Sequence, residues 1–362
     1  MFKQPNYVYD FIMFVTNDPL SVDAYLPILD PTQTRLLSLL DDAYQVRLQH
    51  FSKRVTLHII NNSQNGYCPE DCNYCAQSKS VDTDIERYGL KELDEMVNEA
   101  DQAYEKGAYR YCMVLSGRGP TPTKINQLSS VIRTIKSKYP EKEICLSAGL
   151  INDSMAVALK SAGLDRLNHN LNSSEKNYEA ICSTHTYQDR LQTLKSAQKA
   201  GLSLCSGLIV GLGETKAELI ELALKFRELN IPSIPVNFLI PIPGTPFEHS
   251  KPLDPEFCLR VLCLFRFINP KAEIRIAGGR EYNLRSLQVM GLYPANSIFM
   301  DGYLNVTGSN QIQTLEMIKD AGFDIDSTDI DVNTLLNQHK QNESSRSDVP
   351  LKDLADLRPT FT

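Results

Sequence analysis

The stretch Tyr67-Cys68-Pro69-Glu70-Asp71-Cys72-Asn73-Tyr74-Cys75-Ala76-Gln77-Ser78 decides how the rest of the chain is interpreted. Its three cysteines have the spacing C-x3-C-x2-C and follow an apolar run, 55–60, that predicts a β-strand. Soft thiolate ligands suit iron–sulfur clusters or zinc. A closed zinc site needs a fourth Cys or His, and the nearest one before the loop is His58. The spacing therefore favours a cubane iron–sulfur cluster with three protein ligands and one open iron over a chance grouping of thiols.

After this loop, segments with strand and helix patterns alternate along the chain. The predicted strands are 55–61, 110–116, 143–148, 166–171, 203–210, 233–240, 273–278 and 296–300. The predicted helices are 89–106, 123–138, 154–162, 187–200, 215–229, 255–268 and 283–291. Eight such units over about 250 residues are typical of a (β/α)8 barrel. A doubly wound sheet is the alternative, but its G-x-G-x-x-G fingerprint is missing. The predicted fold class is α/β, a (β/α)8 TIM-type barrel.

The segments on either side of the barrel are predicted from their patterns. Residues 1–52 are expected to form an N-terminal helical extension, because Pro31 to Phe51 has helical spacing and suits a cap or lid. The barrel is expected to span 53–305, followed by a C-terminal cap over 306–337. Residues 338–362 have no core pattern, which predicts a solvated, disordered tail.

The composition limits the classes of partner and the compartment. The chain has 37 basic and 44 acidic residues, a formal charge of −7, and no basic block. We therefore expect neither nucleic acid nor an anionic membrane as a partner. No apolar run approaches the ~20 residues of a membrane span, and the N-terminus is a poor secretory signal. Nine cysteines, an odd number, favour reduced thiols and metal ligation over disulfides, and hence the cytoplasm.

The alternation of side chains along the predicted strands puts polar groups inside the barrel. Alternate side chains of a strand point to opposite faces, and the bulky apolar parity can pack against the outer helices. The other parity carries thiol, guanidinium and amide groups: Arg110, Cys112, Cys145, Asn168, Asn170, Asn172, Cys205, Asn237 and Arg275. An ordinary barrel interior is filled by Val, Ile and Leu, and unpaired buried polar groups are costly. We therefore expect the lumen to hold a ligand.

Three of these lumen residues are thiols on different strands, which could hold a second, smaller cluster. The alternative is that these three thiols are small buried side chains that only fill space in the core. Arg275 is a poor iron donor by its chemistry, because its guanidinium stays protonated and has no free lone pair. On chemical grounds we expect Arg275 to be an ion-pair partner, or a hydrogen-bond donor to a cluster sulfide.

The motifs also carry a family resemblance. C-x3-C-x2-C with an aromatic residue, Tyr74, before the last cysteine resembles the signature of the radical S-adenosylmethionine (AdoMet) enzymes. The longer string YCPEDCNYCAQS is similar to the biotin synthase family, and the similarity covers about 54–302. It includes SGRGP (116–120), LNHNLNSS (167–174), THTYQDR (184–190), CSGLIVGLGET (205–215), GGREYNLRSLQ (278–288) and ANSIF (295–299).

The resemblance implies an enzyme that inserts sulfur into dethiobiotin to make biotin, with a [4Fe–4S] cluster, a [2Fe–2S] cluster and AdoMet as cofactors. It implies that the [4Fe–4S] cluster is held by Cys68, Cys72 and Cys75. It implies that the [2Fe–2S] cluster is held by Cys112, Cys145, Cys205 and Arg275. No catalytic residue is expected beyond these cluster ligands.

The resemblance also implies ligand contacts. Tyr74, Asn170, Asn172 and Ile209 would contact AdoMet, and Asn168, Asn170 and Asn237 would hold the ureido ring of dethiobiotin. Many members have Asp where this chain has Asn172, and an aromatic residue where it has Leu167. Five further residues are expected to be structural: His169 and His185 as satisfied histidines, and Cys182, Cys258 and Cys263 as small buried hydrophobes.

The implied partners are an electron donor such as flavodoxin or ferredoxin, the iron–sulfur assembly machinery and a second copy in a homodimer. Two alternatives stay open from the sequence. One is a related radical AdoMet enzyme with a different substrate, and the other is an iron–sulfur barrel without turnover.

Overall fold

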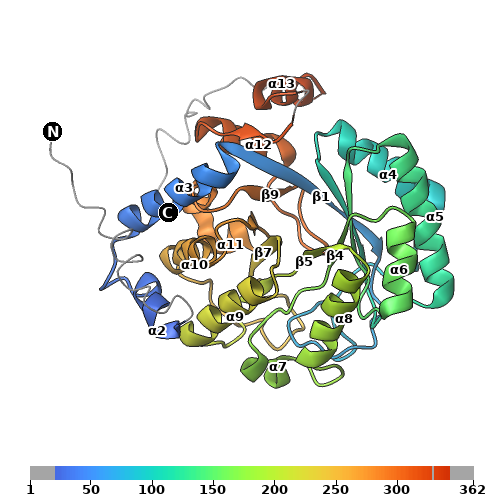
Figure 1. The fold of residues 1–362 in the computed structure, drawn as a ribbon, viewed down its shortest axis with the longest axis horizontal. Helices are drawn as coiled ribbons and strands as arrows, with labels where there is room; N and C mark the ends of the chain where they lie inside the picture. The colour runs from blue at the N-terminus through green and yellow to red at the C-terminus, as the bar shows by residue number, and fades with distance from the viewer. Residues whose placement is uncertain (1–20, 328–329, 343–362) are drawn as a thin grey trace, which may run out of the picture.

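The computed structural model of the protein describes residues 21–327 and 330–342, and Figure 1 shows them as a barrel of strands surrounded by helices. The barrel strands are β1 (Arg54–Gln64), β2 (Arg110–Leu115), β3 (Glu143–Ser147), β4 (Arg166–Asn168), β5 (Ser203–Cys205), β6 (Leu208–Val210), β7 (Ser233–Phe238), β8 (Glu273–Ile276) and β9 (Ser297–Met300). Neighbours pair in parallel in the order β1-β2-β3-β4-β5-β7-β8-β9, and β9 pairs with β1. This pairing closes the barrel and confirms the predicted fold class.

The predicted strands and the structure differ most at 203–210. There the chain forms two short strands, β5 and β6, and both pair with β7. Gly207 lies between them, where a Cβ atom would come within 2.0 Å of the Pro235 carbonyl oxygen. Only glycine allows this close approach of the two backbones.

The outer helices follow the barrel strands. They are α4 (Leu93–Glu105), α5 (Pro122–Lys138), α6 (Asp153–Ser161), α7 (Glu175–Ile181), α8 (Tyr187–Lys199), α9 (Lys216–Glu228), α10 (Pro255–Ile268), α11 (Arg280–Leu284) and the 3-10 helix η2 (Arg285–Leu292). Local sequence starts several of them. The Thr186 and Thr215 side chains cap α8 and α9 in capping boxes with Asp189 and Glu218. The predicted helix 283–291 is mostly 3-10, and α7 was not predicted.

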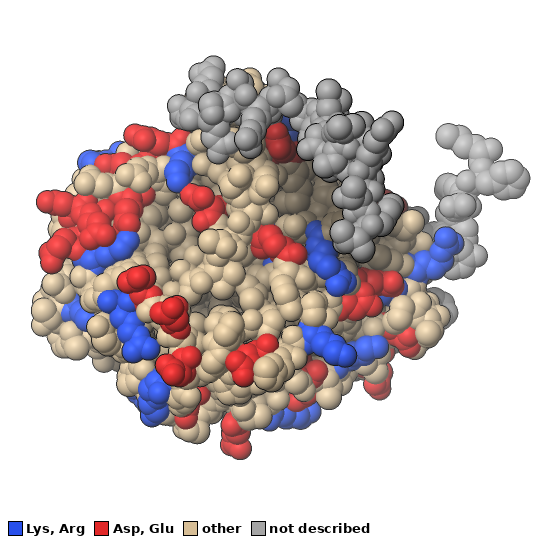
Figure 2. All heavy atoms as spheres, turned by 180° about the vertical axis from the view of Figure 1, so that it is seen from behind, with Lys and Arg blue, Asp and Glu red and all other residues tan. Residues whose placement is uncertain are grey.

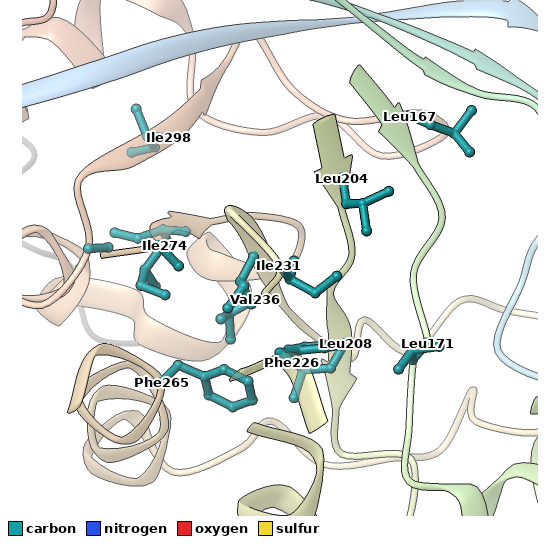
Figure 3. Close-up of a cluster of buried hydrophobic side chains, with 14 of the residues drawn as sticks. Leu167, Leu171, Leu204, Leu208, Phe226, Ile231, Val236, Phe265, Ile274 and Ile298 are labelled. Atoms are coloured by element: carbon teal, nitrogen blue, oxygen red, sulfur yellow. The ribbon is translucent and has the colours of Figure 1, made fainter. Parts of the chain in front are cut away.

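The apolar parity of the strands packs against these helices, as predicted. Figure 3 shows Val236 and Ile274 of the barrel lying near Phe226 of α9 and Phe265 of α10. All four side chains are fully buried. The hydrophobic core therefore lies between the barrel and its helices, which leaves the lumen to the opposite parity.

The N-terminal extension consists of α2 (Val22–Tyr25), the 3-10 helix η1 (Leu26–Leu29) and α3 (Leu36–Phe51). Arg260 of α10 donates to the Ile28 and Thr34 carbonyl oxygens at 2.9 and 2.6 Å. Arg47 of α3 donates to the carbonyl oxygens of Ala295 and Arg54 at 2.9 and 2.8 Å, before β9 and at the start of β1. The extension therefore caps the barrel at the opposite end from the cysteine loop. Residues 1–20 lie outside the described residues.

After the barrel, the chain forms α12 (Gln311–Asp320), the short strand β10 (Asp324–Ile325) and α13 (Val332–Asn342). β10 pairs in parallel with the first residues of β1. The helix α13 extends to Asn342 and so includes the first residues of the tail predicted from residue 338. The rest of that prediction, 343–362, lies outside the described residues.

Two surface properties bear on partners. On the face shown in Figure 2, acidic and basic side chains are interspersed. Within residues 21–327 and 330–342, no helix has the length and hydropathy needed to cross a membrane.

Candidate active site and cluster cavities

The cysteine loop follows the carboxyl end of β1 and lines a cavity of about 330 Å³. Cys68, Cys72 and Cys75 all line this cavity. The loop is held by its own polar groups: Ser78 Oγ donates to the Glu70 carbonyl oxygen at 3.1 Å, and Gly66 N donates to Gln77 Oε1 at 2.8 Å. The structure therefore brings the three predicted ligands to one cavity at the mouth of the barrel.

Without a bound metal, the surroundings of the loop thiols favour their protonated form. Burial raises the pKa of the Cys75 thiol to about 11. Hydrogen bonding to Cys182, and then burial, raises the pKa of Cys72. A thiophilic cation in the cavity would supply the positive charge that stabilises thiolates here. Three thiols without a fourth protein ligand in the loop fit a cluster with an open iron.

Two residues expected at AdoMet are joined across this cavity. Asn172 has a left-handed backbone, with φ of 67°, and its Nδ2 donates to the Tyr74 hydroxyl at 2.5 Å. The Asn172 carbonyl oxygen accepts from Ile209 N at 2.8 Å. Tyr74, Asn172 and Ile209 therefore form one wall of the cavity. The strand predicted over 166–171 is shorter in the structure, because β4 ends at Asn168, so the alternation of side chains does not extend to Asn170 and Asn172.

The three asparagines expected at the substrate differ in how their amides are used. Asn237 donates to the Leu208 carbonyl oxygen and accepts from Gly278 N, both at 2.9 Å. Asn170 Oδ1 accepts from Gly207 N at 2.9 Å. Asn168 Oδ1 is buried and has no hydrogen-bond partner among the described residues. Because a buried carbonyl without a partner is costly, Asn168 offers the clearest site for a polar ligand.

A second cavity, of about 180 Å³, lies deeper in the barrel and is lined by Cys112, Cys145 and Arg275. The two cavities share part of their lining: Val114, Ser147, Asn168, Asn170, Asn237 and Leu304. The predicted substrate asparagines therefore form the wall between the cysteine loop and the lumen thiols.

Strand register explains why the lumen thiols meet. Cys112 and Cys145 are direct partners across β2 and β3, and Cys205 is the partner of Asn168 across β4 and β5. Cys112, Cys145 and Cys205 are buried together with Ala277 and Phe299. The structure thus brings together the three thiols that the strand alternation assigned to one face.

A buried ion network surrounds these thiols. Glu273 accepts from Arg110 Nη1 and Nη2, each at 3.0 Å, and also pairs with Arg275. Arg110 Nε donates to Glu143 Oε2 at 2.6 Å. Sequence reasoning missed the two glutamates, and it considered His58, which lies 3.2 Å from Glu273, only as a possible zinc ligand. The strand alternation could have revealed the glutamates, because Glu143 and Glu273 each lie two residues before a lumen residue and therefore on the same strand face.

Arg275 is the expected ion-pair partner, and its hydrogen bonds show which atom faces the thiols. Its Nε donates to Ser297 Oγ at 3.1 Å, and its Nη2 donates to Ser233 Oγ at 2.9 Å and pairs with Glu273. Nη1 faces Cys205 Sγ at 3.9 Å. Burial works to lower the pKa of Arg275, but Glu273 and the neighbouring Cys205 and Cys112 together outweigh it and raise that pKa.

The charges of this network fit a cluster held by three thiolates. Arg110, Arg166 and Arg275 carry three positive charges, and Glu143 and Glu273 carry two negative charges. His58 stays neutral, because burial and the neighbouring arginines lower its pKa. The surroundings therefore carry one net positive charge. An oxidised [2Fe–2S] core with three thiolates carries one negative charge, which balances it.

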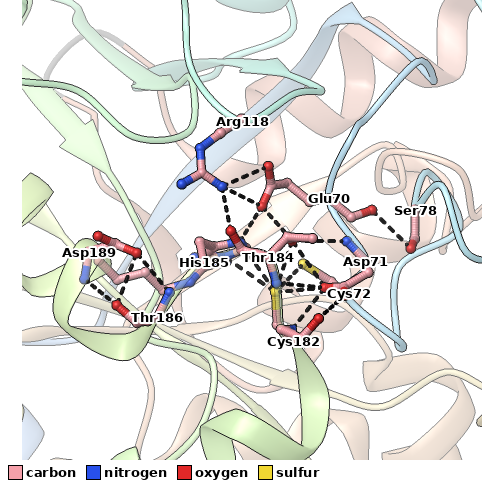
Figure 4. A network of polar contacts seen from close by, with 12 residues as sticks. Glu70, Asp71, Cys72, Ser78, Arg118, Cys182, Thr184, His185, Thr186 and Asp189 are labelled. Carbon is pink, nitrogen blue, oxygen red and sulfur yellow. Dashed lines mark hydrogen bonds and ion pairs between the residues drawn. The ribbon is translucent and has the colours of Figure 1, made fainter.

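A second network ties the cysteine loop to the segment between α7 and α8 (Figure 4). Glu70 Oε2 lies 2.5 Å from His185 Nδ1 and accepts from Thr184 Oγ1 at 2.7 Å. His185 Nε2 lies 2.8 Å from Arg190 Nη2. Because a guanidinium only donates, Nε2 accepts and the ring proton sits on Nδ1, facing Glu70. Sequence reasoning also missed Arg190, which lines the first cavity.

The structural roles expected for the other histidines and cysteines hold in part. His185 is satisfied at both nitrogens, as expected. His169 is not, since its buried Nε2 has no hydrogen-bond partner in the described chain. Cys182 is not simply a hydrophobe, because its sulfur lies 3.7 Å from Cys72 Sγ and 3.2 Å from His185 Nδ1. Cys258 and Cys263 are fully buried in α10, as expected.

Comparison with solved structures supports the fold. The FeFe-hydrogenase maturase HydG from Carboxydothermus hydrogenoformans has a TM-score of 0.72 at 20% identity, covering 87% of this chain and 78% of that chain. Methylornithine synthase (PylB) has a TM-score of 0.72 at 17% identity, covering 86% of this chain and 96% of that chain. At such identities the likeness shows the fold alone.

Sequence comparison identifies the family. The Radical SAM superfamily profile matches residues 62–226, and the Biotin and Thiamin Synthesis associated domain matches 235–324. A biotin synthase from Acaryochloris marina is 53% identical over 300 residues, 83% of this chain and 86% of that protein. One from Magnetococcus marinus is 52% identical over 298 residues, 82% of this chain and 92% of that protein. The predicted resemblance and its cofactor classes, AdoMet and iron–sulfur clusters, are confirmed. The chain therefore belongs to the biotin synthase family of radical AdoMet enzymes.

Proposed function

We propose that the chain converts dethiobiotin to biotin. In this proposal the first cavity binds the [4Fe–4S] cluster and AdoMet, and the second cavity holds the sulfur source. The observation that carries this proposal is the wall of asparagines shared by the two cavities, with three thiols on either side of it. A substrate bound at this wall would lie between the two predicted cluster sites. When bound, the first cluster and AdoMet supply a deoxyadenosyl radical, and the second cluster supplies the sulfur atom.

In this proposal the residues of the first cavity bind and orient. Cys68, Cys72 and Cys75 hold the [4Fe–4S] cluster. AdoMet lies against Tyr74, Asn170, Asn172 and Ile209, and the Tyr74–Asn172 hydrogen bond supports this by fixing the position of both side chains. Gly207 between β5 and β6 keeps this wall close to β7.

The asparagine wall positions the ureido ring of dethiobiotin. Asn168 supplies the acceptor Oδ1 that lacks a partner in the described chain. Asn170 and Asn237 are oriented by their hydrogen bonds to the backbone, and each amide retains at least one N–H and a second lone pair of its oxygen for a ligand. The apolar residues Phe299 and Leu304 flank this position and help to exclude water.

The residues of the second cavity hold the sulfur source. Cys112 and Cys145, which line this cavity, and Cys205, which is buried with them, would be its thiolate ligands, and Arg275 presents Nη1 towards Cys205. The arginine and glutamate network keeps the buried charge balanced and fixes the Arg275 side chain. Arg275 acts mainly through charge and hydrogen bonding, since a protonated guanidinium has no lone pair for iron.

Further partners are proposed from the family and from cysteine usage. An electron donor such as flavodoxin or ferredoxin would reduce the first cluster, and the iron–sulfur assembly machinery would load both clusters. We also propose a homodimer in the cytoplasm, where nine unpaired cysteines remain reduced. The domain limits 1–52, 53–305, 306–337 and 338–362 stay predictions.

The deciding experiment is anaerobic turnover of the reconstituted full chain with reductant, AdoMet and dethiobiotin. We expect both biotin and deoxyadenosine. Deoxyadenosine without biotin would favour a related enzyme with another substrate, and neither product would favour a barrel without turnover. Asn168→Ala is the informative variant, because it should weaken dethiobiotin binding while both clusters still assemble. Cys258→Ser is the matched control, because Cys258 is buried in α10 outside both cavities.

A further inference from the structure

The sulfur atoms of Cys72 and Cys182 lie 3.7 Å apart although the residues are 110 positions apart in the chain. Cys72 is the middle cysteine of the loop, and Cys182 follows α7 (Figure 4). Both side chains are buried. A disulfide has about 2.05 Å between its sulfurs, so the two sulfur atoms would have to approach each other by about 1.7 Å.

Hydrogen bonds on both sides of Cys72 hold its loop against the segment that contains Cys182. Before Cys72, Asp71 Oδ1 accepts from Ser183 N at 2.9 Å and from Thr184 N at 3.1 Å. After Cys72, Asn73 N donates to the Ile181 carbonyl oxygen at 3.0 Å. The residues flanking one cysteine thus bond the residues flanking the other. The pair is therefore a fixed feature of the fold and not an accident of two side-chain rotamers.

The two thiols are reached from different sides. Cys72 lines the first cavity, at the mouth of the barrel. Cys182 lines a separate cavity of about 580 Å³ against α7 and the start of α8. Two exposed acids, Glu175 and Glu179, line that second opening. A small oxidant can therefore reach Cys182 without entering the substrate cavity, and a cationic one is favoured.

We propose that Cys72 and Cys182 form a thiol–disulfide site, which closes when the chain lacks its first cluster. The oxidant is a low-molecular-weight disulfide. The Cys182 thiol attacks it, one Cys182–S bond forms, the S–S bond of the oxidant breaks, and one small thiol leaves with the proton. The Cys72 thiol then attacks the mixed disulfide at Cys182 and releases a second small thiol. Two electrons pass from the protein to the oxidant, and two protons leave with the two thiols.

The consequence rests on the proposed role of Cys72 as a cluster ligand. With Cys72 in a disulfide, two thiols remain at the loop, and the first cluster cannot be rebuilt until a thiol reductant opens the bond. The disulfide also keeps Cys72 from further oxidation to sulfinic or sulfonic acid, which would be irreversible. Cys182 would thus hold the cluster-free enzyme in a form that can be loaded again.

The test uses the full chain, with clusters intact or removed anaerobically by a chelator, and cystamine as a cationic disulfide probe. After tryptic digestion under non-reducing conditions, we expect the peptide 177–190, which contains Cys182, to be linked to the loop peptide through Cys72. The link should form in the cluster-free chain, be absent in the loaded chain, and reverse with dithiothreitol. Cys72→Ala should abolish it, and Cys68→Ala and Cys258→Ser should retain it.

The second measurement is recovery of the first cluster after cystamine treatment, followed by absorbance and iron and sulfide analysis. The parent should lose reconstitution until it is reduced, whereas Cys182→Ala should keep it. A Cys182 peptide that stays unlinked, or that links to Cys68 or Cys75 instead, would overturn the proposal. Equal loss of reconstitution in the parent and in Cys182→Ala would do the same. Neither measurement needs turnover, so failure of the proposed function would be seen separately, in the biotin assay.

Discussion

Glu273→Gln is the sharpest perturbation of the second cavity, because Glu273 is the acid shared by the lumen arginines. Its carboxylate accepts from both terminal nitrogens of Arg110 and pairs with Arg275, and it also accepts from Ser233 and Ser297. Glutamine keeps the shape of the side chain and removes its charge. The change therefore tests the electrostatic argument with little change in packing.

The expected cost follows from the charge count around Glu273. In the parent, three arginines face two glutamates, and the variant leaves three arginines with Glu143 alone. The Glu273 side chain is 12% exposed, so water screens little of this charge. Removing one partner of a buried ion pair costs about 3–5 kcal/mol, and we expect a loss of unfolding free energy in that range. Arg275→Met should cost less, because Glu273 would still be bidentate with Arg110.

The pH dependence distinguishes this mechanism from a packing defect. Burial alone would raise the pKa of Glu273, but Arg110 and then Arg275 outweigh it and hold that pKa well below its usual range. A depressed pKa stabilises the fold above the unfolded value near 4.5 and loses that contribution as the pH falls towards the folded pKa. The difference between the parent and Glu273→Gln should therefore be full at pH 7.5 and shrink below about pH 4.5.

The assay is urea unfolding of the cluster-free full chain at pH 7.5 and pH 4. Glu95→Gln is the matched control, because Glu95 is exposed and pairs with Lys91 at 3.6 Å. That control should change the unfolding free energy by less than about 0.5 kcal/mol. A loss below about 1 kcal/mol for Glu273→Gln, or the same loss at both pH values, would refute the charge-balance reasoning.

Four further predictions follow from the structure. Cys68→Ala should abolish AdoMet cleavage, because a site with three thiolates has no spare ligand, and deoxyadenosine release at the parent rate would contradict the assignment. Cys112→Ala should lose biotin formation and lower the sulfide count while the first cluster still forms; normal biotin yield would place the sulfur source elsewhere. Arg275→Met should still assemble a [2Fe–2S] cluster, with an altered spectrum and partial activity, and a Mössbauer spectrum lacking that cluster would show us wrong. Burial, and then the charge of Asp41, raises the pKa of Asp42 to about 6, so its carboxylate destabilises the fold as the pH rises from about 4 to 6. Asp42→Asn should therefore add about 1 kcal/mol to the unfolding free energy at pH 7.5, after allowance for solvent screening, and nothing at pH 3.5; equal gains at both pH values would rule this out.

The sequence by itself was sufficient for the parts of this protein that depend on short-range periodicity. The C-x3-C-x2-C spacing put three thiols in one loop, and the alternation of apolar residues located the eight barrel strands and the lumen face. These patterns are readable because a strand repeats every two residues and a helix about every 3.6. The same rule placed Cys112 and Cys145 on one face, and their register across β2 and β3 made them neighbours.

Where the alternation stopped, prediction from the sequence became unreliable. Asn172 adopts a left-handed backbone after β4 ends at Asn168, so strand periodicity no longer describes the direction of its side chain. The helix α7 was missed because it has only seven residues, too few for a clear helical period. The alternation had placed the asparagines in the lumen, and family similarity, not the local pattern, indicated which ligands they would contact.

Only the tertiary structure decided the contacts between distant parts of the chain. Arg110 and Glu273 are 163 residues apart, and Cys72 and Cys182 are 110 apart. Each residue taken alone has an ordinary local pattern, since a buried acid or thiol in a sequence does not indicate which partner it meets. Closure of the barrel brings Glu273 next to Arg110. The hydrogen bonds of Asp71 and Asn73 to the segment after α7 bring Cys72 next to Cys182. The physical reason is that hydrogen bonds and ion pairs act over a few ångströms in space, whatever the separation along the chain.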